Sequence, residues 1–169
     1  MNDRHISRAA LFGYSMGGYV ALHLAAKRPE LVSSVATLAT KLAWTPETAA
    51  HETARLVPAT IRAKVPKFAE SLERRHAGCG GWETVLARTA QLMIQLGDNP
   101  VIDGPMLSGI TIPVRFMVGD RDAVVSLDET AAGARNMPRG ELAVLPNTSH
   151  PIEGVDLAVL ASLLRTALV

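Results

Sequence analysis

Residues 12–32 read FGYSMGGYVALHLAAKRPELV, and this stretch decides the fold that we predict for the chain. It overlaps a short apolar run at residues 8–13, which is typical of a buried parallel strand. A tight turn follows, and residues 16–28 have the apolar periodicity of a helix that Pro29 terminates. The next apolar segment, residues 31–39, predicts a second strand. Strand, turn, helix and strand in this order form a βαβ unit, which predicts an α/β fold with a parallel sheet.

The remainder of the chain divides into a helical stretch and a second α/β segment. Residues 45–105 carry three helical patterns and no clear strand, and Pro58 and Pro66 are interpreted as breaks between helices. Strands then alternate with helices: the predicted strands are 113–118 and 141–145, and the predicted helices are 126–136 and 157–168. The first of these helices is predicted to begin with an S-x-x-E capping box formed by Ser126 and Glu129. We therefore predict an α/β core formed by residues 1–44 and 106–169, into which a helical unit is inserted at residues 45–105.

Composition excludes several classes of protein. The chain has 169 residues, 48% of them hydrophobic, which fits one globular domain rather than a disordered chain. Lys and Arg number 17 against 16 acidic residues, and without a basic excess we expect no nucleic-acid partner. No apolar run is long enough for a membrane span or a signal peptide. The one cysteine, Cys79, cannot form an internal disulfide, so we predict a cytoplasmic protein.

The motif G-x-S-x-G stands between the first predicted strand and the first helix, at Gly13 to Gly17. In a nucleophile elbow the serine, here Ser15, has a strained backbone, and side chains two residues to either side would collide. The turn raises the serine oxygen to a helix N-terminus, where developing negative charge is favoured. A glycine-rich nucleotide-binding turn is the alternative, but G-x-G-x-x-G and GK[ST] are both absent. The motif therefore predicts Ser15 as a nucleophile.

Three segments together resemble the α/β-hydrolase superfamily, in particular its small esterase-like and lactonase-like members. Residues 12–32 resemble the nucleophile elbow and the helix after it. IPVRFMVGDRDAVVS, residues 112–126, resembles the strand that ends in G-x-x-D and supplies the catalytic acid. LPNTSHPIEGVDLAVLASLL, residues 145–164, resembles the last strand, the histidine loop and the closing helix. The order Ser, Asp, His is the one this superfamily uses. The resemblance implies a partial α/β-hydrolase fold in which residues 45–105 form a cap or lid.

The resemblance also implies a role for each candidate site residue. Asp122 corresponds to the acid because it stands three residues after a glycine, and Asp120 is the competing carboxylate, with a loop hydrogen bond as its alternative role. His150 corresponds to the base that takes the serine proton and returns it to the leaving group. Met16 is expected to donate its backbone N–H to the oxyanion hole. Tyr14 is a candidate to line the substrate pocket, with core packing as the alternative.

The sequence departs from this family before the elbow. The family places several strands there, and this sequence has only about a dozen residues. The early segment normally supplies the second oxyanion N–H, and it normally pairs with the nucleophile strand. Residues 9–13 are therefore expected to form an exposed sheet edge, which invites pairing with another chain. We expect a homodimer through this edge.

Two functions remain open at this point. The first is a serine hydrolase that cleaves a small carboxylic ester, thioester or lactone through an acyl-enzyme. This chemistry needs no cofactor, and the sequence shows no metal-ligand spacing and no dinucleotide fingerprint. The second is a catalytically impaired relative that acts as a binding or assembly partner. Three intact motifs favour the enzyme, whereas the short segment before the elbow favours the second reading.

Overall fold

Four parallel strands form one sheet in the order β1-β2-β3-β4 in the computed structural model, which describes residues 6–168. The strands are β1 (Ala9–Tyr14), β2 (Val32–Leu38), β3 (Val114–Gly119) and β4 (Gly140–Leu145). β1 and β2 end level, since Tyr14 pairs with Leu38, and β3 and β4 end level two residues farther on, since Leu38 pairs with Met117 and Gly119 with Leu145. Since all four strands are parallel, the loops that follow them meet at one edge of the sheet. This confirms the predicted α/β class and its parallel sheet.

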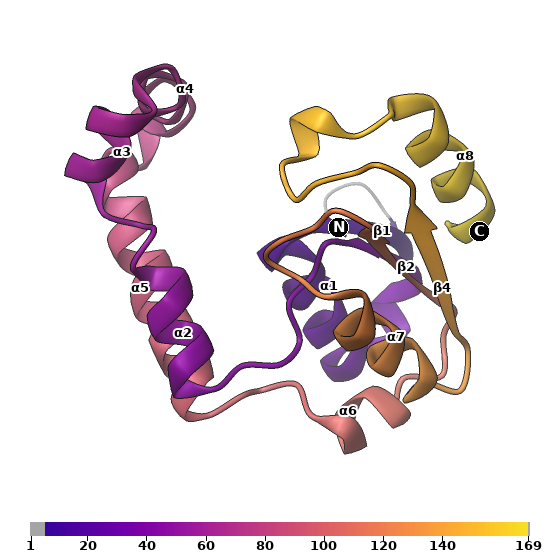
Figure 1. The fold of residues 1–169 in the computed structure, drawn as a ribbon. Coiled ribbons are helices and arrows are strands. Elements are labelled where there is room, and N and C mark those ends of the chain that lie inside the picture. The colour runs from indigo at the N-terminus through magenta and orange to yellow at the C-terminus, as the bar shows by residue number, and fades with distance from the viewer. Residues whose placement is uncertain (1–5, 169) are drawn as a thin grey trace. The chain divides into compact units, whose positions relative to one another are not determined.

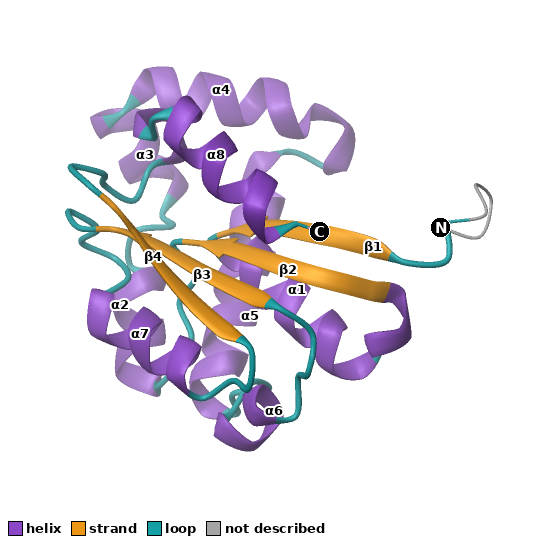
Figure 2. Ribbon diagram, turned by 90° about the vertical axis from the view of Figure 1, so that its right-hand side faces the viewer, coloured by secondary structure: helices purple, strands orange, loops and turns teal. Residues whose placement is uncertain are grey.

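Helices cover both faces of this sheet (Figure 2). Helix α1 (Met16–Lys27) packs on β1 and β2, and α7 (Leu127–Arg135) packs on β3 and β4 from the same face. Helix α8 (Leu157–Ala167) covers the opposite face, where its buried Leu160 joins a core cluster with Leu38, Met117 and Leu145. Burial of each such side chain stabilises the fold by about 1.5–3 kcal/mol relative to exposure. Apolar periodicity in the sequence predicted α1 and α8, and the S-x-x-E pattern predicted α7.

Polar side chains fix where two of these helices begin. Asp156 precedes α8, and its carboxylate accepts hydrogen bonds from the N–H groups of Ala158 and Val159. Ser126 precedes α7 and accepts from the N–H of Glu129, as the S-x-x-E pattern predicted. Such caps satisfy N–H groups that have no partner within the helix. They place the start of α7 and α8 close behind the loops that bear the candidate acid and base.

The chain divides into two compact units. The first joins the chain up to Leu42 with the chain from Ile102 onward and contains the sheet. The second, which we call the helical unit, spans Ala43–Val101. Its helices are α2 (Pro46–Thr53), α3 (Pro58–Lys64), α4 (Pro66–His76) and α5 (Trp82–Asp98), and α2 lies beside α5 (Figure 1). Helix α6 (Gly104–Ser108) belongs to the sheet-bearing unit. Three short 3-10 helices complete the described elements, at Pro29–Leu31, Ala77–Cys79 and Ile152–Gly154.

The helical unit corrects one sequence interpretation. Pro58 and Pro66 do not simply break helices: each is the first residue of one, α3 and α4 respectively. Proline suits this position because its missing N–H would have no helical partner there. The stretch therefore holds more helices than the three patterns predicted. A small core of Ile61, Ala69 and Trp82 lies within this unit.

No helix among residues 6–168 is long and apolar enough to cross a membrane.

Candidate active site

Ser15 stands in a strained turn between β1 and α1. Its backbone has φ 51° and ψ −121°, a left-handed conformation that is rare for residues other than glycine. Three hydrogen bonds hold the turn: the Ser15 N–H donates to the Leu38 carbonyl at 2.8 Å, and the Ser15 carbonyl accepts from Gly18 N–H and from the Thr40 hydroxyl, each at 3.0 Å. The buried Thr40 follows β2, so the neighbouring strand holds the elbow in place.

Close neighbouring atoms leave no room for a side chain at Gly13 and Gly18, two of the three glycines around Ser15. A Cβ on Gly13 would lie 2.4 Å from the carbonyl oxygen of Gly17, as the elbow motif implies. A Cβ on Gly17, in contrast, would meet no atom within 4 Å, so the predicted collision there is wrong. The collision falls one residue later, where a Cβ on Gly18 would lie 1.9 Å from the Thr40 hydroxyl oxygen. At position 18 a side chain is therefore excluded by Thr40, at the end of the neighbouring strand, rather than by the turn itself.

The structure brings Ser15, His150 and Asp122 into one line of contacts. Ser15 Oγ lies 3.3 Å from His150 Nε2, and His150 Nδ1 lies 3.0 Å and 3.2 Å from the two carboxylate oxygens of Asp122. An ionised carboxylate can only accept hydrogen bonds, so Nδ1 carries the ring proton and Nε2 is left as an acceptor. This tautomer can receive the Ser15 proton. The Asp122 side chain is fully buried and that of His150 is 19% exposed.

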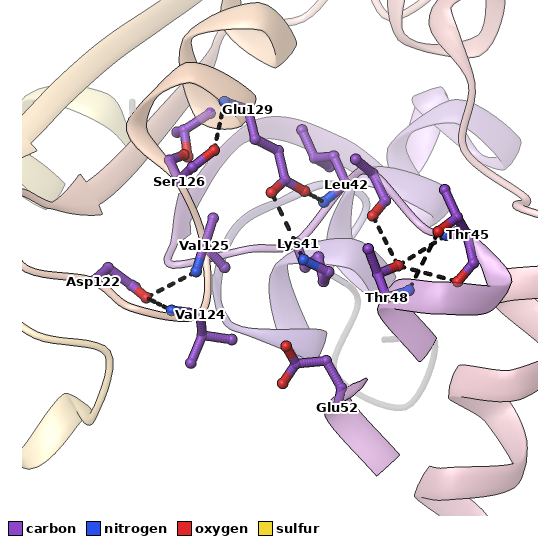
Figure 3. Close-up of polar contacts among 12 residues, drawn as sticks. Lys41, Leu42, Thr45, Thr48, Glu52, Asp122, Val124, Val125, Ser126 and Glu129 are labelled. Carbon is purple, nitrogen blue, oxygen red and sulfur yellow. Dashed lines mark hydrogen bonds and ion pairs between the residues drawn. The ribbon is translucent and has the colours of Figure 1, made fainter. Parts of the chain in front are cut away.

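Backbone groups fix the Asp122 carboxylate. Its Oδ1 accepts from the N–H groups of Val124 at 2.8 Å and Val125 at 2.9 Å (Figure 3). These two bonds curl the chain back toward the carboxylate directly after β3. A buried carboxylate held in this way keeps its orientation toward the imidazole when the ring gains a proton.

Asp120 has a different task from Asp122. Its carboxylate accepts from the N–H of Thr148 at 3.1 Å, two residues before His150. The N–H of Arg121 donates to the Thr148 carbonyl at 3.0 Å, so the turn after β3 binds both backbone polar groups of Thr148, in the loop after β4. Gly119 makes this approach possible, because a Cβ there would lie 2.0 Å from the Thr148 oxygen. The loop hydrogen bond considered for Asp120 from the sequence is therefore present.

Tyr14 contacts the histidine loop directly. Its hydroxyl donates to the backbone carbonyl of His150 at 3.0 Å, and the two rings lie 5.6 Å apart, tilted by 42°. Burial raises the pKa of the phenol, and this effect outweighs the opposite influence of the Ile152 backbone N–H. The hydroxyl therefore stays protonated and able to donate. The sequence did not predict this bond, and contact between Tyr14 and a substrate stays a prediction.

Met16 is the first residue of α1, directly after Ser15. The first N–H groups of an α-helix have no partner within the helix and carry the positive end of its dipole. Donation of the Met16 N–H to an oxyanion stays a prediction, and its place at the start of α1 is compatible with it. Among residues 6–168 no three His, Cys, Asp or Glu side chains gather in a group that could hold a metal ion.

A second polar cluster, also at this edge of the sheet, was not predicted. The Glu129 carboxylate accepts from the N–H of Leu42 at 2.6 Å and lies 3.9 Å from Lys41 Nζ (Figure 3). It thereby ties the end of the β2 loop to α7. Sequence reasoning assigned Glu129 to a helix cap and overlooked Thr40. Both could have been noticed as polar residues predicted to lie near the strand ends that meet at the elbow.

Comparison with known proteins shows what the chain is similar to. Residues 5–78 match the family model described as alpha/beta hydrolase fold. No curated protein matches the sequence. Many solved structures superpose on nearly the whole chain, and three of them are described next.

The first of these structures is 2-hydroxy-6-oxo-6-phenylhexa-2,4-dienoate hydrolase from Rhodococcus sp. strain RHA1, with 22% identity and a TM-score of 0.70 over 99% of this chain. The second is Est816, an N-acyl homoserine lactone degrading enzyme, with 20% identity and a TM-score of 0.71 over 98% of this chain. The third is a thermophilic esterase from Thermogutta terrifontis, with 22% identity and a TM-score of 0.65 over 95% of this chain. The chain covers 66%, 69% and 64% of these three proteins, respectively. At such identities the likeness establishes the fold.

Proposed function

We propose that the chain is a serine hydrolase of the α/β-hydrolase family, on the premise of its partial α/β-hydrolase fold and of the family model that matches residues 5–78. Its substrate would be a small carboxylic ester, thioester or lactone. One observation carries the proposal: the contacts run without a gap from Ser15 Oγ through the His150 imidazole to the buried Asp122 carboxylate. Such a line is what a neutral serine needs to become a nucleophile.

The first half of the reaction would form an acyl-enzyme. Ser15 Oγ attacks the carbonyl carbon while its proton passes to His150 Nε2, and Asp122 stabilises the imidazolium that results. The carbonyl oxygen becomes an oxyanion, and the Met16 N–H donates to it. When the tetrahedral intermediate collapses, the bond to the leaving group breaks and Nε2–H protonates the departing oxygen or sulfur.

The second half would hydrolyse the acyl-enzyme. Water attacks the acyl carbon, gives its proton to Nε2, and the bond to Ser15 Oγ breaks as that oxygen regains a proton. The products are a carboxylic acid and an alcohol or thiol, or a hydroxy acid when the substrate is a lactone. The similar proteins described above include an esterase and a lactone-degrading enzyme, and their activities support this range of substrates.

A fluorophosphonate tests the proposal, because it labels serines that are activated as nucleophiles. Intact mass spectrometry should show one label on the wild-type chain and none on Ser15→Ala or His150→Ala. Ser108→Ala is the matched control, since its hydroxyl bonds to the Pro105 carbonyl on α6. A well-folded wild-type chain that takes up no label would contradict the proposal.

A second candidate function is a catalytically impaired relative that acts as a binding or assembly partner. One observation favours it: among residues 6–168, β1 pairs with β2 on one side and with no strand on the other. Absence of the label would support this alternative.

The same edge is the basis for the proposed homodimer. Unpaired backbone groups along an edge strand can pair with a strand from another chain, and Phe12 on β1 is 38% exposed. Analytical ultracentrifugation of the wild-type chain should show a dimer, and a monomer at every concentration tested would contradict this proposal. A cytoplasmic location stays a prediction.

The helical unit is proposed to act as the cap that selects substrates, as expected for residues 45–105. It interrupts the sheet-bearing unit between β2 and β3, and its α4 carries Phe68 with 48% of the side chain exposed. If the unit contacts the acyl group, Phe68→Ser should raise KM for long acyl chains more than for acetyl esters. An equal effect on all chain lengths would contradict the assignment.

A further inference from the structure

We propose that Tyr14 is a positioning residue: its hydroxyl holds the backbone at His150 and thereby sets the imidazole against Ser15. The inference rests on the function proposed above, in which His150 is the base. It assigns to Tyr14 a task beyond lining a pocket. Tyr14 acts on the reaction through His150 and need not touch the substrate.

The sheet order explains why such a residue is needed. Ser15 follows β1 and His150 follows β4, and these strands stand at opposite ends of the order β1-β2-β3-β4. No ladder of backbone hydrogen bonds joins them directly, so a change in sheet twist or in the loop after β4 would alter the 3.3 Å distance from Oγ to Nε2. Tyr14 spans this separation with one side chain.

The geometry of Tyr14 suits this task. It is the last residue of β1 and the residue before Ser15, so its own backbone is fixed with the elbow. Its hydroxyl reaches the His150 carbonyl at 3.0 Å, while its ring lies 5.6 Å from the imidazole and limits how far the imidazole can turn. One side chain therefore contacts both the backbone and the ring of the residue that must stay aligned.

Other contacts hold the loop farther from His150 itself. Asp120 and Arg121 bind the Thr148 peptide, and Asp122 binds Nδ1 of the ring. Within residues 6–168, the hydrogen bond to the His150 carbonyl itself comes from the Tyr14 hydroxyl. Its loss would leave the ring anchored to Asp122 but freer to move relative to Ser15.

The test compares Tyr14→Phe with Tyr19→Phe, the change at the other of the two tyrosines. Tyr14→Phe keeps the ring and removes the hydroxyl. Tyr19→Phe removes an equally defined bond in the same unit, since the buried Tyr19 hydroxyl accepts from the Ile102 N–H at 3.0 Å. Fluorophosphonate labelling kinetics give the maximal rate of labelling and the concentration for half-maximal rate separately.

We expect Tyr14→Phe to lower the maximal labelling rate about five- to tenfold, the effect of losing one hydrogen bond, with the half-maximal concentration unchanged. Tyr19→Phe should leave the maximal rate unchanged. Hydrogen exchange supplies a readout independent of activity: the Thr148, Gly154 and Val155 amides, which are hydrogen-bonded here, should exchange faster in Tyr14→Phe alone.

The outcomes separate this inference from the proposed function. Slower labelling and faster loop exchange confined to Tyr14→Phe would support it. Unchanged labelling and exchange in Tyr14→Phe, or equal losses in both variants, would overturn it. A wild-type chain that takes up no label, with faster exchange in Tyr14→Phe, would refute the proposed hydrolase and with it the role in reaction, while showing that Tyr14 holds the loop.

Discussion

Gly119→Ala tests how closely the strand that leads to the acid approaches the loop that bears the base. Gly119 ends β3, pairs with Leu145 of β4 and is buried. The new Cβ would lie 2.0 Å from the carbonyl oxygen of Thr148 and 2.6 Å from its carbonyl carbon. Both are backbone atoms, so rotation of a side chain cannot relieve the clash.

The size of the effect follows from these distances. Real Cβ atoms essentially never approach within 3.0 Å of another heavy atom, so the Thr148 peptide must move by about 1 Å or more. The loop should move rather than β3, because Gly119 is held in the sheet ladder. Overpacking of this kind costs about 1–3 kcal/mol of stability. Because His150 lies two residues away, a displacement of about 1 Å should slow reaction at Ser15 by roughly a hundredfold.

The assay pairs urea unfolding with the rate of fluorophosphonate labelling. Gly104→Ala is the matched control, since a Cβ at that position, on the first residue of α6, would meet no atom within 4 Å. The control should keep the wild-type labelling rate. If Gly119→Ala folds and reacts with the label as fast as the control does, the proposed link between the Thr148 peptide and the His150 ring is refuted.

Three further predictions test separate parts of the structure. Asp122→Asn should abolish detectable fluorophosphonate labelling, because an amide no longer selects the reactive tautomer of His150. Asp120→Asn should retain most of the labelling rate and lower only stability. The reverse ranking of the two variants would exchange the two roles. Arg115→Met should lower the free energy of unfolding by ~2 kcal/mol, measured in urea, because the Arg115 side chain is 15% exposed and its guanidinium bonds to β4 and to the end of α8. Unchanged stability would show that these hydrogen bonds do not stabilise the fold. Burial raises the pKa of Tyr14 above its ordinary value of 10.0, so the unfolded state loses the phenolic proton first and stability should fall as the pH rises above about 10; a wild-type pH profile identical to that of Tyr14→Phe would refute this.

Much of the fold could be predicted because its signals are local. The run before Gly13 and the helix ended by Pro29 needed only strand and helix periodicity. Pro58 and Pro66 were misjudged because proline both ends one helix and begins another, and nothing in the local pattern separates the two effects.

The three residues that the structure brings together could be named from the sequence, whereas the contacts that support them could not. Ser15, Asp122 and His150 carry motifs that can be recognised in sequence. Thr40 has no such motif: its bond to the Ser15 carbonyl depends on the pairing of two strands. Likewise, the Tyr14 hydroxyl reaches a residue 136 positions away, a contact that only the folded sheet specifies.

The way in which the helical unit is inserted has a consequence for how such a protein can change. The chain leaves the sheet-bearing unit after Leu42 and returns at Ile102, while Ser15, Asp122 and His150 all stand on the sheet-bearing side of these two crossings. Lineages could lengthen, shorten or replace the inserted segment without altering the register of the strands that carry the reactive groups. If the helical unit selects the substrate and Ser15 reacts, as proposed, substrate preference and the capacity to react can evolve as nearly independent traits.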